Sequence, residues 1–394
     1  MTLAIDGGKP AVQGPLLPYN SIGLAEEDKA ASIVAGWRLS GYLGGGRRGG
    51  YWVCKLEDEW AARFGVKHAI ACNSATSGLL AAAHAIELGA GARFLCSPLT
   101  MSATAAAPAM TGAQPLFIDV HRSTFCLDPA MSVIAVEPTE AVFLTHLFGL
   151  AQNEVEWKGW CDAHGCKLIV DAAQAPFADD HGVLAGTAGD VGVYSLNVHK
   201  HLQCGEGGIV VTNDDDLASR VRLFINHGEL ADGPLGLNLR MTEVAAGIAL
   251  IQLRRADALI ANRVKQAEDL IRAIVARPLM GLQIPATMYD RPATKHVYYT
   301  VPFTCGAHID RAWLIEALRA EGVPLTEGYG PPLHRLPAFK GCGWPCPVAD
   351  ELHDRTLFYF ENCAYSPTPT QINQIGEAFA KVIEHADRRT LHRT

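Results

Sequence analysis

The sequence is poor in charged residues and contains no run of basic ones. Of its 394 residues, 19% are Asp, Glu, Lys or Arg, and the formal net charge at pH 7 is −8. A mildly acidic chain without a basic cluster lacks the positive surface by which proteins bind nucleic-acid phosphates. We therefore expect no nucleic-acid partner.

Long hydrophobic segments are also missing. Every apolar stretch ends before it reaches the roughly 18 residues that indicate a membrane-spanning helix. The opening residues, MTLAIDGGKP, have neither the basic block nor the apolar block of a signal peptide. These two absences predict a cytoplasmic protein with no membrane partner.

The cysteines form no recognisable metal or disulfide framework. There are 11 of them, an odd number, scattered along the chain. Cys161 and Cys166 are close in sequence, as are Cys342 and Cys346, but neither pair has the C-x-x-C spacing of a zinc site. We interpret the cysteines as reduced core residues and predict no bound metal.

What the sequence does contain is a large apolar fraction in alternating helical and strand-like segments. Apolar residues make up 49% of the chain, which excludes a disordered protein. Strands apolar on both faces, alternating with amphipathic helices, predict a doubly wound α/β domain around a mostly parallel sheet. The predicted helices are residues 24–37, 51–64, 76–88 and 102–110, and the predicted strands are 68–72, 93–96, 115–120, 141–145, 167–170, 191–195 and 208–212.

The last third of the chain has a different pattern. One long helical segment is predicted over residues 241–276, and Pro278 ends it. A β-branched and aromatic strand over 297–303 follows, with helices over 311–321 and 372–385. We therefore predict a large domain at 1–284 and a smaller α+β domain at 285–394.

A glycine run at residues 44–49 (GGGRRG) formally matches the dinucleotide-binding pattern G-x-G-x-x-G. That motif requires a preceding strand and an acidic residue about 20 positions later. Here a helix precedes the run, and residue 69 is Ala. We interpret residues 41–50 as a loop near a site.

Two neighbouring strands carry polar residues at their carboxyl ends, where open α/β sheets bind ligands. The strand at 167–170 is followed by Asp171, and the next strand leads through Ser195 and Asn197 to Lys200. A lysine and a carboxylate suit pyridoxal 5'-phosphate, which needs an amine for its Schiff base and an acid beside its ring nitrogen. The same two residues are equally compatible with an ordinary ion pair.

A phosphate group would need a site of its own. Residues 72–78 (CNSATSG) lie between a strand and a helix and have small side chains and hydroxyls. Such a turn presents backbone N–H groups to an anion, although a plain helix cap has the same composition.

Together these motifs resemble the DegT/DnrJ/EryC1/StrS aminotransferases. The resemblance is carried by LEDEWAARFGVKHAIACNSATSGL, THLFG, DAAQA, GDVGVYSLNVHK, CGEGG, INHGE and GLNLRMTEVAAGIALIQL. It implies the fold of fold-type-I pyridoxal-phosphate transferases. The opening LAIDGGKP and the closing CPVADEL and IGEAFAKVIEH look most like the branch of aminohydroxybenzoate synthases and scyllo-inosose aminotransferases.

The resemblance implies a role for each matching residue. Lys200 would bind the cofactor covalently and act in catalysis with Asp171, which would pair with the ring nitrogen, and Gln174 would lie near the ring hydroxyl. The phosphate would be held by Ala75, Thr76 and Ser195 and, across a homodimer interface, by Asn238 of the neighbouring subunit. Arg240 would bind substrate anions or form a structural salt bridge.

Three positions depart from the family pattern. Met101 stands where an aromatic residue commonly stacks on the cofactor ring, Asn197 replaces a frequent His, and His199 replaces a frequent Thr. A methionine can still pack against an aromatic face. The candidates for contacting the substrate are His199 and residues 329–335, which begin with Tyr329.

The implied reaction is a ping-pong transamination in which the cofactor alternates with pyridoxamine 5'-phosphate. The donor would be glutamate or glutamine, and the acceptor a keto sugar, such as a nucleotide-linked one, or a keto cyclitol. Two alternatives stay open: an elimination of the aminohydroxybenzoate synthase type, and a non-catalytic module that only binds the cofactor.

Overall fold

The protein is described by a computed structural model that covers residues 2–42, 48–127, 138–228, 235–277, 281–284 and 293–391. Most of the glycine run at 44–49 and Pro278 lie outside these residues. A seven-stranded sheet forms the centre, in the order β2-β10-β9-β6-β5-β3-β4. Its strands are β2 (His68–Cys72), β3 (Arg93–Cys96), β4 (Gln114–Phe117), β5 (Ala141–Thr145), β6 (Lys167–Asp171), β9 (Val191–Ser195) and β10 (Gly208–Thr212).

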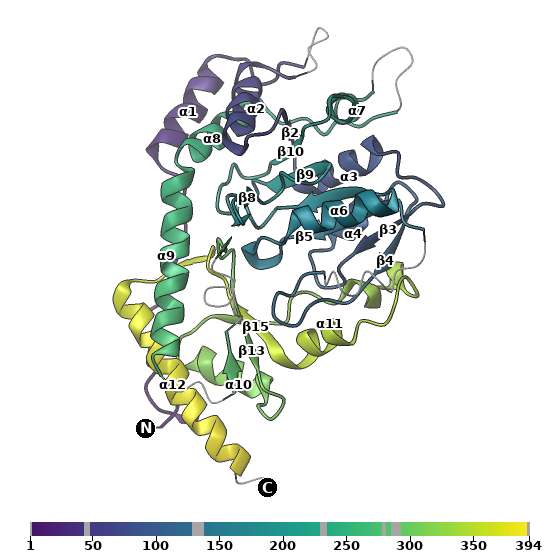
Figure 1. Ribbon diagram of the computed structural model, residues 1–394. Coiled ribbons are helices and arrows are strands. Elements are labelled where there is room, and N and C mark those ends of the chain that lie inside the picture. The colour runs from purple at the N-terminus through teal and green to yellow at the C-terminus, as the bar shows by residue number, and fades with distance from the viewer. Residues whose placement is uncertain are drawn as a thin grey trace.

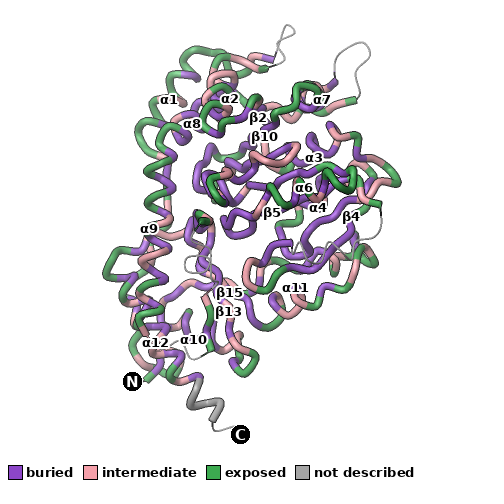
Figure 2. The backbone as a smooth tube through the Cα atoms, viewed as in Figure 1, coloured by how far each residue is buried: buried purple, intermediate pink, exposed green. Residues whose placement is uncertain are grey.

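Only one strand of this sheet runs against the others. β10 is antiparallel to both β2 and β9, and the remaining neighbours are parallel. The predicted α/β unit with a mostly parallel sheet is thereby confirmed. In Figure 2 the strands of this sheet lie in the buried interior, and the exposed segments lie on the outer helices.

Helices cover both faces of the sheet, because its strands bury side chains on both sides. One face carries α2, α6 and α8, through side chains such as Trp60, Trp157 and Leu250. The other carries α3, α4 and α7. The helices of this unit are α1 (Leu24–Ala35), α2 (Tyr51–Phe64), α3 (Ala75–Ala85), α4 (Ala103–Ala109), α6 (Glu154–His164), α7 (Asp215–Ile225) and α8 (Glu243–Arg254).

The helix predicted over 241–276 is two helices, α8 and α9 (Ala256–Val275). The chain bends at Arg255, whose φ of −95° and ψ of 1° leave the helical region. The Arg255 guanidinium is bound by the Ser21 carbonyl at 3.1 Å and by Glu26 at 2.5 Å. No glycine or proline marks this bend, so the sequence pattern missed it.

A four-stranded antiparallel sheet, β11-β13-β15-β14, forms the C-terminal part. α9 runs down one side of the molecule to this part and packs there against the last helix, α12 (Figure 1). The elements are β11 (Leu282–Gln283), β13 (Val301–Cys305), α10 (Arg311–Ala320), β14 (Leu325–Glu327), α11 (Pro347–Glu351), β15 (Leu357–Phe360) and α12 (Pro369–Leu391).

Several short elements were not predicted. They are the strands β1 (Leu17–Pro18), β7 (Asp179–Asp180), β8 (Val183–Leu184), β12 (Thr294–Lys295) and β16 (Tyr365–Ser366), and helical turns at Ala4–Asp6, Leu147–Gly149, Leu333–Arg335, Pro337–Phe339 and Leu352–Thr356. β1 pairs with β16, and Leu3 and Val12 belong to the C-terminal core. The N-terminal segment thus packs on the C-terminal part, and the domain division at residue 284 stays a prediction.

Candidate functional site

A cavity of about 410 Å³ lies at the carboxyl ends of β6 and β9, beside the first turn of α3. Most of the residues that the sequence singled out line it. These are Ala75, Thr76, Met101, Asp171, Gln174, Ser195, Asn197, His199, Lys200 and Tyr329. Asn238 and Arg240 do not line it.

Strand geometry explains why two of these side chains face the same way. Side chains alternate along a strand, so Asp171 shares the face of Ile169 on β6, and Ser195 shares the face of Val193 on β9. Ile169 and Val193 both belong to the core beneath α3 and α4. Asp171 and Ser195 therefore both point toward the start of α3.

The Asp171 carboxylate is buried and held in a defined orientation. Its Oδ2 accepts a hydrogen bond from the Thr104 hydroxyl at 2.7 Å, and its Oδ1 accepts one from the Ala173 N–H at 3.1 Å. The Thr104 hydroxyl lies 3.2 Å from that of Thr100. These two donors orient the carboxylate toward a polar or cationic group in the cavity.

Lys200 lines the same cavity as this carboxylate. Within the part of the chain that the structure describes, no salt bridge joins Lys200 to Asp171. The Lys200 ammonium instead lies 4.1 Å from the centre of the Tyr299 ring. Burial lowers the pKa of Lys200 to about 8, although the Asp171 charge acts in the opposite direction. A lysine with this pKa can exchange a proton near neutral pH.

The first turn of α3 also lines the cavity. Ser74 caps the helix by accepting a hydrogen bond from the Ser77 N–H at 3.1 Å. Among the described residues, the N–H groups of Ala75 and Thr76 have no acceptor, and both residues line the cavity. Free N–H groups at a helix start attract anions such as phosphate.

Gly208 allows this turn to lie close to β10. A Cβ at Gly208 would be 2.5 Å from the Ser74 carbonyl and 2.6 Å from the Ala75 nitrogen. Any larger residue would therefore displace the backbone that presents the free N–H groups.

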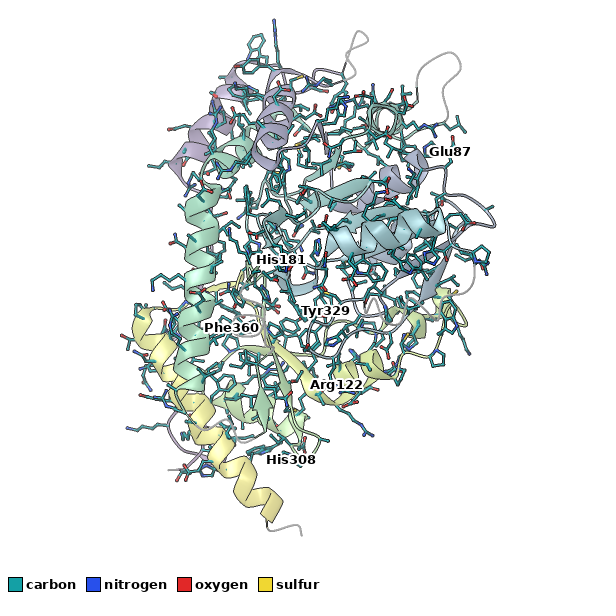
Figure 3. The ribbon with its side chains drawn as sticks, in the orientation of Figure 1. Glu87, Arg122, His181, His308, Tyr329 and Phe360 are labelled. Atoms are coloured by element: carbon teal, nitrogen blue, oxygen red, sulfur yellow. The ribbon has the colours of Figure 1, made fainter. Side chains whose placement is uncertain are left out.

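Gln174 connects the large sheet to the C-terminal part. Its Oε1 accepts a hydrogen bond from the Phe148 N–H at 2.7 Å, and its Nε2 donates to the Tyr329 hydroxyl at 2.6 Å. Figure 3 labels Tyr329 in the middle of the molecule, where the C-terminal strands meet the large unit. Two rings of the C-terminal part, Tyr299 and Tyr329, thus close the cavity.

The three positions that depart from the family pattern all lie at the cavity. Met101 is 54% exposed, and its Sδ is 3.2 Å from the Ala103 nitrogen. The Asn197 amide donates to Glu206 at 2.9 Å and accepts from the His199 N–H at 3.1 Å. These contacts fix Asn197 but leave Met101 accessible to a ligand.

Asn238 and Arg240 lie together outside the cavity. The Arg240 Nε donates to the Asn238 Oδ1 at 2.9 Å, and its NH1 donates to the Asn226 Oδ1 at 3.1 Å. Asn238 is exposed. The predicted contact of Asn238 with a neighbouring subunit stays a prediction.

Sequence comparison places the chain among known proteins. The model of the DegT/DnrJ/EryC1/StrS aminotransferase family matches residues 44–361. The chain belongs to this family. The resemblance seen in the sequence is thereby confirmed, and with it an aminotransferase of the fold-type-I class.

Individual members of the family match over nearly their whole length. An L-glutamine:2-deoxy-scyllo-inosose aminotransferase from Streptoalloteichus tenebrarius is 29% identical, with 97% of this chain and 98% of the relative aligned. The structure of DesI in the presence of its TDP-sugar product has a TM-score of 0.85 and 28% identity, covering 100% of this chain and 99% of DesI. A 3-amino-5-hydroxybenzoic acid synthase, at 24% identity, shares the fold with a TM-score of 0.83 over 94% and 99% of the two chains.

Two important site residues were missed by sequence reasoning. Tyr299 lies in a predicted strand and Thr104 in a predicted helix, and neither was singled out as a site residue. Tyr299 packs its ring against Lys200 although the two are far apart in sequence. Only Thr104 had a local signal, since it is a hydroxyl in an otherwise Ala-rich helix.

Three further features concern membrane helices, metal ions and the cysteines. None of the helices in the described ranges is both long and apolar enough to cross a bilayer. The same residues hold no cluster of three or more His, Cys, Asp or Glu suited to a metal ion. All eleven cysteines are free thiols.

Proposed function

We propose that this chain binds pyridoxal 5'-phosphate in the cavity and transfers an amino group from glutamate or glutamine to a keto sugar or keto cyclitol. The observation that carries the proposal is that Lys200 and Asp171 line one cavity together with the free N–H groups of Ala75 and Thr76. Names of relatives, a scyllo-inosose aminotransferase and an enzyme with a TDP-sugar product, support an acceptor of this class.

The residues present fit this cofactor. Its phosphate is a dianion, which matches the Ala75 and Thr76 N–H groups and the Ser195 hydroxyl. Its ring nitrogen needs a carboxylate, which Asp171 supplies, and its aldehyde needs an amine, which Lys200 supplies. Gly208 leaves room for the tight turn around the phosphate position.

Each residue has a distinct task in the proposed reaction. The cofactor supplies an electron-accepting ring when it is bound. The Asp171 carboxylate, oriented by Thr104, would hold a proton on the ring nitrogen. The Lys200 Nζ, with its pKa near 8, would take the proton from the donor carbon and pass it to the cofactor, and it would move a proton in the reverse direction when the acceptor is aminated. Tyr299 and Tyr329 limit the access of water to this amine.

We further propose that the enzyme acts as a cytoplasmic homodimer. Asn238, exposed beside Arg240, would contact the cofactor phosphate of the partner chain. Each active site would then contain residues of both chains, which makes dimerisation a requirement for full activity.

A donor and acceptor assay tests the proposed activity. Purified enzyme with pyridoxal 5'-phosphate is incubated with glutamate or glutamine and a panel of keto acceptors, namely scyllo-inosose and nucleotide-linked keto sugars. We expect the 2-oxo acid of the donor and the aminated acceptor in equal amounts. A dehydrated product without 2-oxo acid would favour elimination instead, and no turnover of any kind would favour a binding module.

The Lys200→Ala variant, measured in the same assay, tests the role of this lysine in turnover. We expect its turnover to fall by at least about 1000-fold, because general-base transfer alone typically contributes 100- to 10,000-fold. Lys67→Ala removes an exposed lysine paired with Asp215 and should retain wild-type activity. Equal activity of Lys200→Ala and the wild type would refute the assigned role.

A further inference from the structure

A second, smaller pocket of about 200 Å³ adjoins the cofactor cavity. Its walls include His199, Tyr299 and Tyr329, which also line the cofactor cavity. The remaining walls come from the C-terminal part and include Thr300, Tyr359 and Glu361. Cys363 and Ala364 complete the lining, and we refer to this space as the Glu361 pocket. Lys200 itself does not line it.

Glu361 directly follows β15 and lines this pocket. Within β15, Phe358 and Phe360 belong to the C-terminal core, and Tyr359 between them lines the pocket. Thr326 on β14 lies opposite Tyr359, and its hydroxyl donates to the Glu361 Oε1 at 3.0 Å. The sheet thereby holds the carboxylate in place at the edge of the pocket.

Two polar groups of the pocket lack a suitable partner within the described chain. No lysine, arginine or histidine there forms a salt bridge with Glu361. The nearby Arg319 guanidinium donates two hydrogen bonds to the Leu325 carbonyl, at 2.7 and 2.9 Å. The Thr300 hydroxyl is also unpaired, although the residue is only 3% exposed. A buried hydroxyl without a partner costs free energy, which a ligand that hydrogen-bonds to it would recover.

The chemistry of the walls selects the kind of group that fits. The Glu361 carboxylate repels anions. It therefore disfavours binding of an amino donor's carboxylate or of a nucleotide sugar's diphosphate in this pocket. A carboxylate and aromatic rings together favour an ammonium group, through charge-assisted hydrogen bonds and cation–π contact. The Thr300 hydroxyl adds a site for a ring hydroxyl.

We propose that the Glu361 pocket binds an ammonium group that the acceptor already carries, so that the enzyme adds a further amine to an amino sugar or aminocyclitol. This inference rests on the proposed aminotransferase function and specifies its acceptor. Glu361 is the specificity-determining residue, and the reaction that supplies the acceptor must itself have introduced an amine.

Binding of two matched ligands tests this assignment without turnover. Enzyme loaded with pyridoxamine 5'-phosphate, which cannot condense with amines, is titrated in a calorimeter with scyllo-inosamine and with scyllo-inositol. These probes differ only by an ammonium in place of a hydroxyl. We expect the wild type to bind the amine at least about tenfold more tightly, as hydrogen bonds to charged groups are the stronger ones.

Glu361→Gln keeps the size of the side chain and removes its charge. We expect it to weaken binding of scyllo-inosamine about 10- to 100-fold and to change binding of scyllo-inositol no more than about twofold. Glu327→Gln, an exposed carboxylate on the neighbouring strand that lies 3.7 Å from Arg311, is the matched control and should change neither. The comparison of the two probes on the wild type requires no variant. It therefore tests the proposal even if Glu361→Gln does not fold.

The two proposals fail in different ways. If wild type and Glu361→Gln both form 2-oxo acid from the donor but bind the two probes with equal affinity, the Glu361 assignment is wrong and the aminotransferase stands. If neither protein forms 2-oxo acid from glutamate or glutamine, the proposed function itself is wrong. A preference of the wild type for scyllo-inosamine that Glu361→Gln retains would also overturn the role of Glu361.

Discussion

At the scale of single residues, burial lowers the pKa of Lys200, and the same burial lowers the free energy of unfolding while the amine is charged. The pKa of the lysine falls from 10.5 to about 8 because burial disfavours the charged form. Below pH 8 the amine is protonated in both the folded and the unfolded chain, so the full penalty of the buried charge is present. Between pH 8 and 10.5 only the unfolded chain keeps the proton, and stability rises with pH.

Replacing this amine should therefore stabilise the cofactor-free protein at neutral pH. We expect Lys200→Met to raise the free energy of unfolding by about 1–3 kcal/mol at pH 7, since each unit of pKa corresponds to about 1.4 kcal/mol. The gain should shrink as the pH rises through 8 toward 10. Urea unfolding of both proteins at pH 7 and pH 9.5 measures it, and a gain independent of pH would contradict the proposed cause.

Asp171 and its partner Thr104 show which residues of the site can be predicted from the sequence and which cannot. Asp171, Ser195 and Lys200 were found because they follow buried strands, where polar residues stand out. Thr104, which orients Asp171, was not found, because the two are 67 positions apart and pair only through the fold. Sequence reasoning identifies the groups that do chemistry more readily than those that position them.

At the scale of elements, the site depends on the close approach of β10 to the first turn of α3. Gly208 begins β10 and lies against the peptide between Ser74 and Ala75. This contact sets where the free N–H groups point. The cofactor affinity should consequently be sensitive to a single methyl group at this position.

Gly208→Ala tests this dependence. The added Cβ would lie about 2.5 Å from backbone atoms that cannot move without shifting the turn, so we expect the Kd for pyridoxal 5'-phosphate to rise at least about tenfold. Fluorescence titration with the cofactor measures the effect. Gly159→Ala in α6 meets nothing within 4 Å and should leave the Kd unchanged. Wild-type affinity in Gly208→Ala would show that the turn does not hold the phosphate.

The elements themselves were predicted to different degrees. Strands such as β2 and β5 were located because buried apolar runs with turn residues on both sides have few other interpretations. Two-residue strands such as β7 carry no such pattern. The bend at Arg255 depends on contacts with Ser21 and Glu26, which no local pattern reports.

At the scale of the whole molecule, the candidate active site lies where the large sheet meets the C-terminal part, and Figure 3 labels one of its residues, Tyr329. The large unit supplies Lys200, Asp171 and His199, and the C-terminal part supplies Tyr299, Tyr329 and most of the Glu361 pocket. Gln174 and Tyr329, which are 155 positions apart, are joined by a hydrogen bond across this boundary. The proposed reactive groups therefore lie on one unit, and most of the groups proposed to select the acceptor lie on the other.

This arrangement also explains why the acceptor could not be read from the sequence. Apart from His199, the residues of the Glu361 pocket lie in β15 or in segments next to β13, β14 and β15. Their juxtaposition depends on the pairing of these three strands. Family motifs identify the cofactor chemistry, because that part of the site is local to strand ends. Substrate choice depends on tertiary structure.

The most direct test of the account is to identify the amine that holds the cofactor. The protein is incubated with pyridoxal 5'-phosphate, reduced with borohydride, digested and examined by mass spectrometry. We expect one label per chain, on the peptide that contains Lys200, and no label in Lys200→Ala. A label on another lysine, or none at all in the wild type, would contradict it.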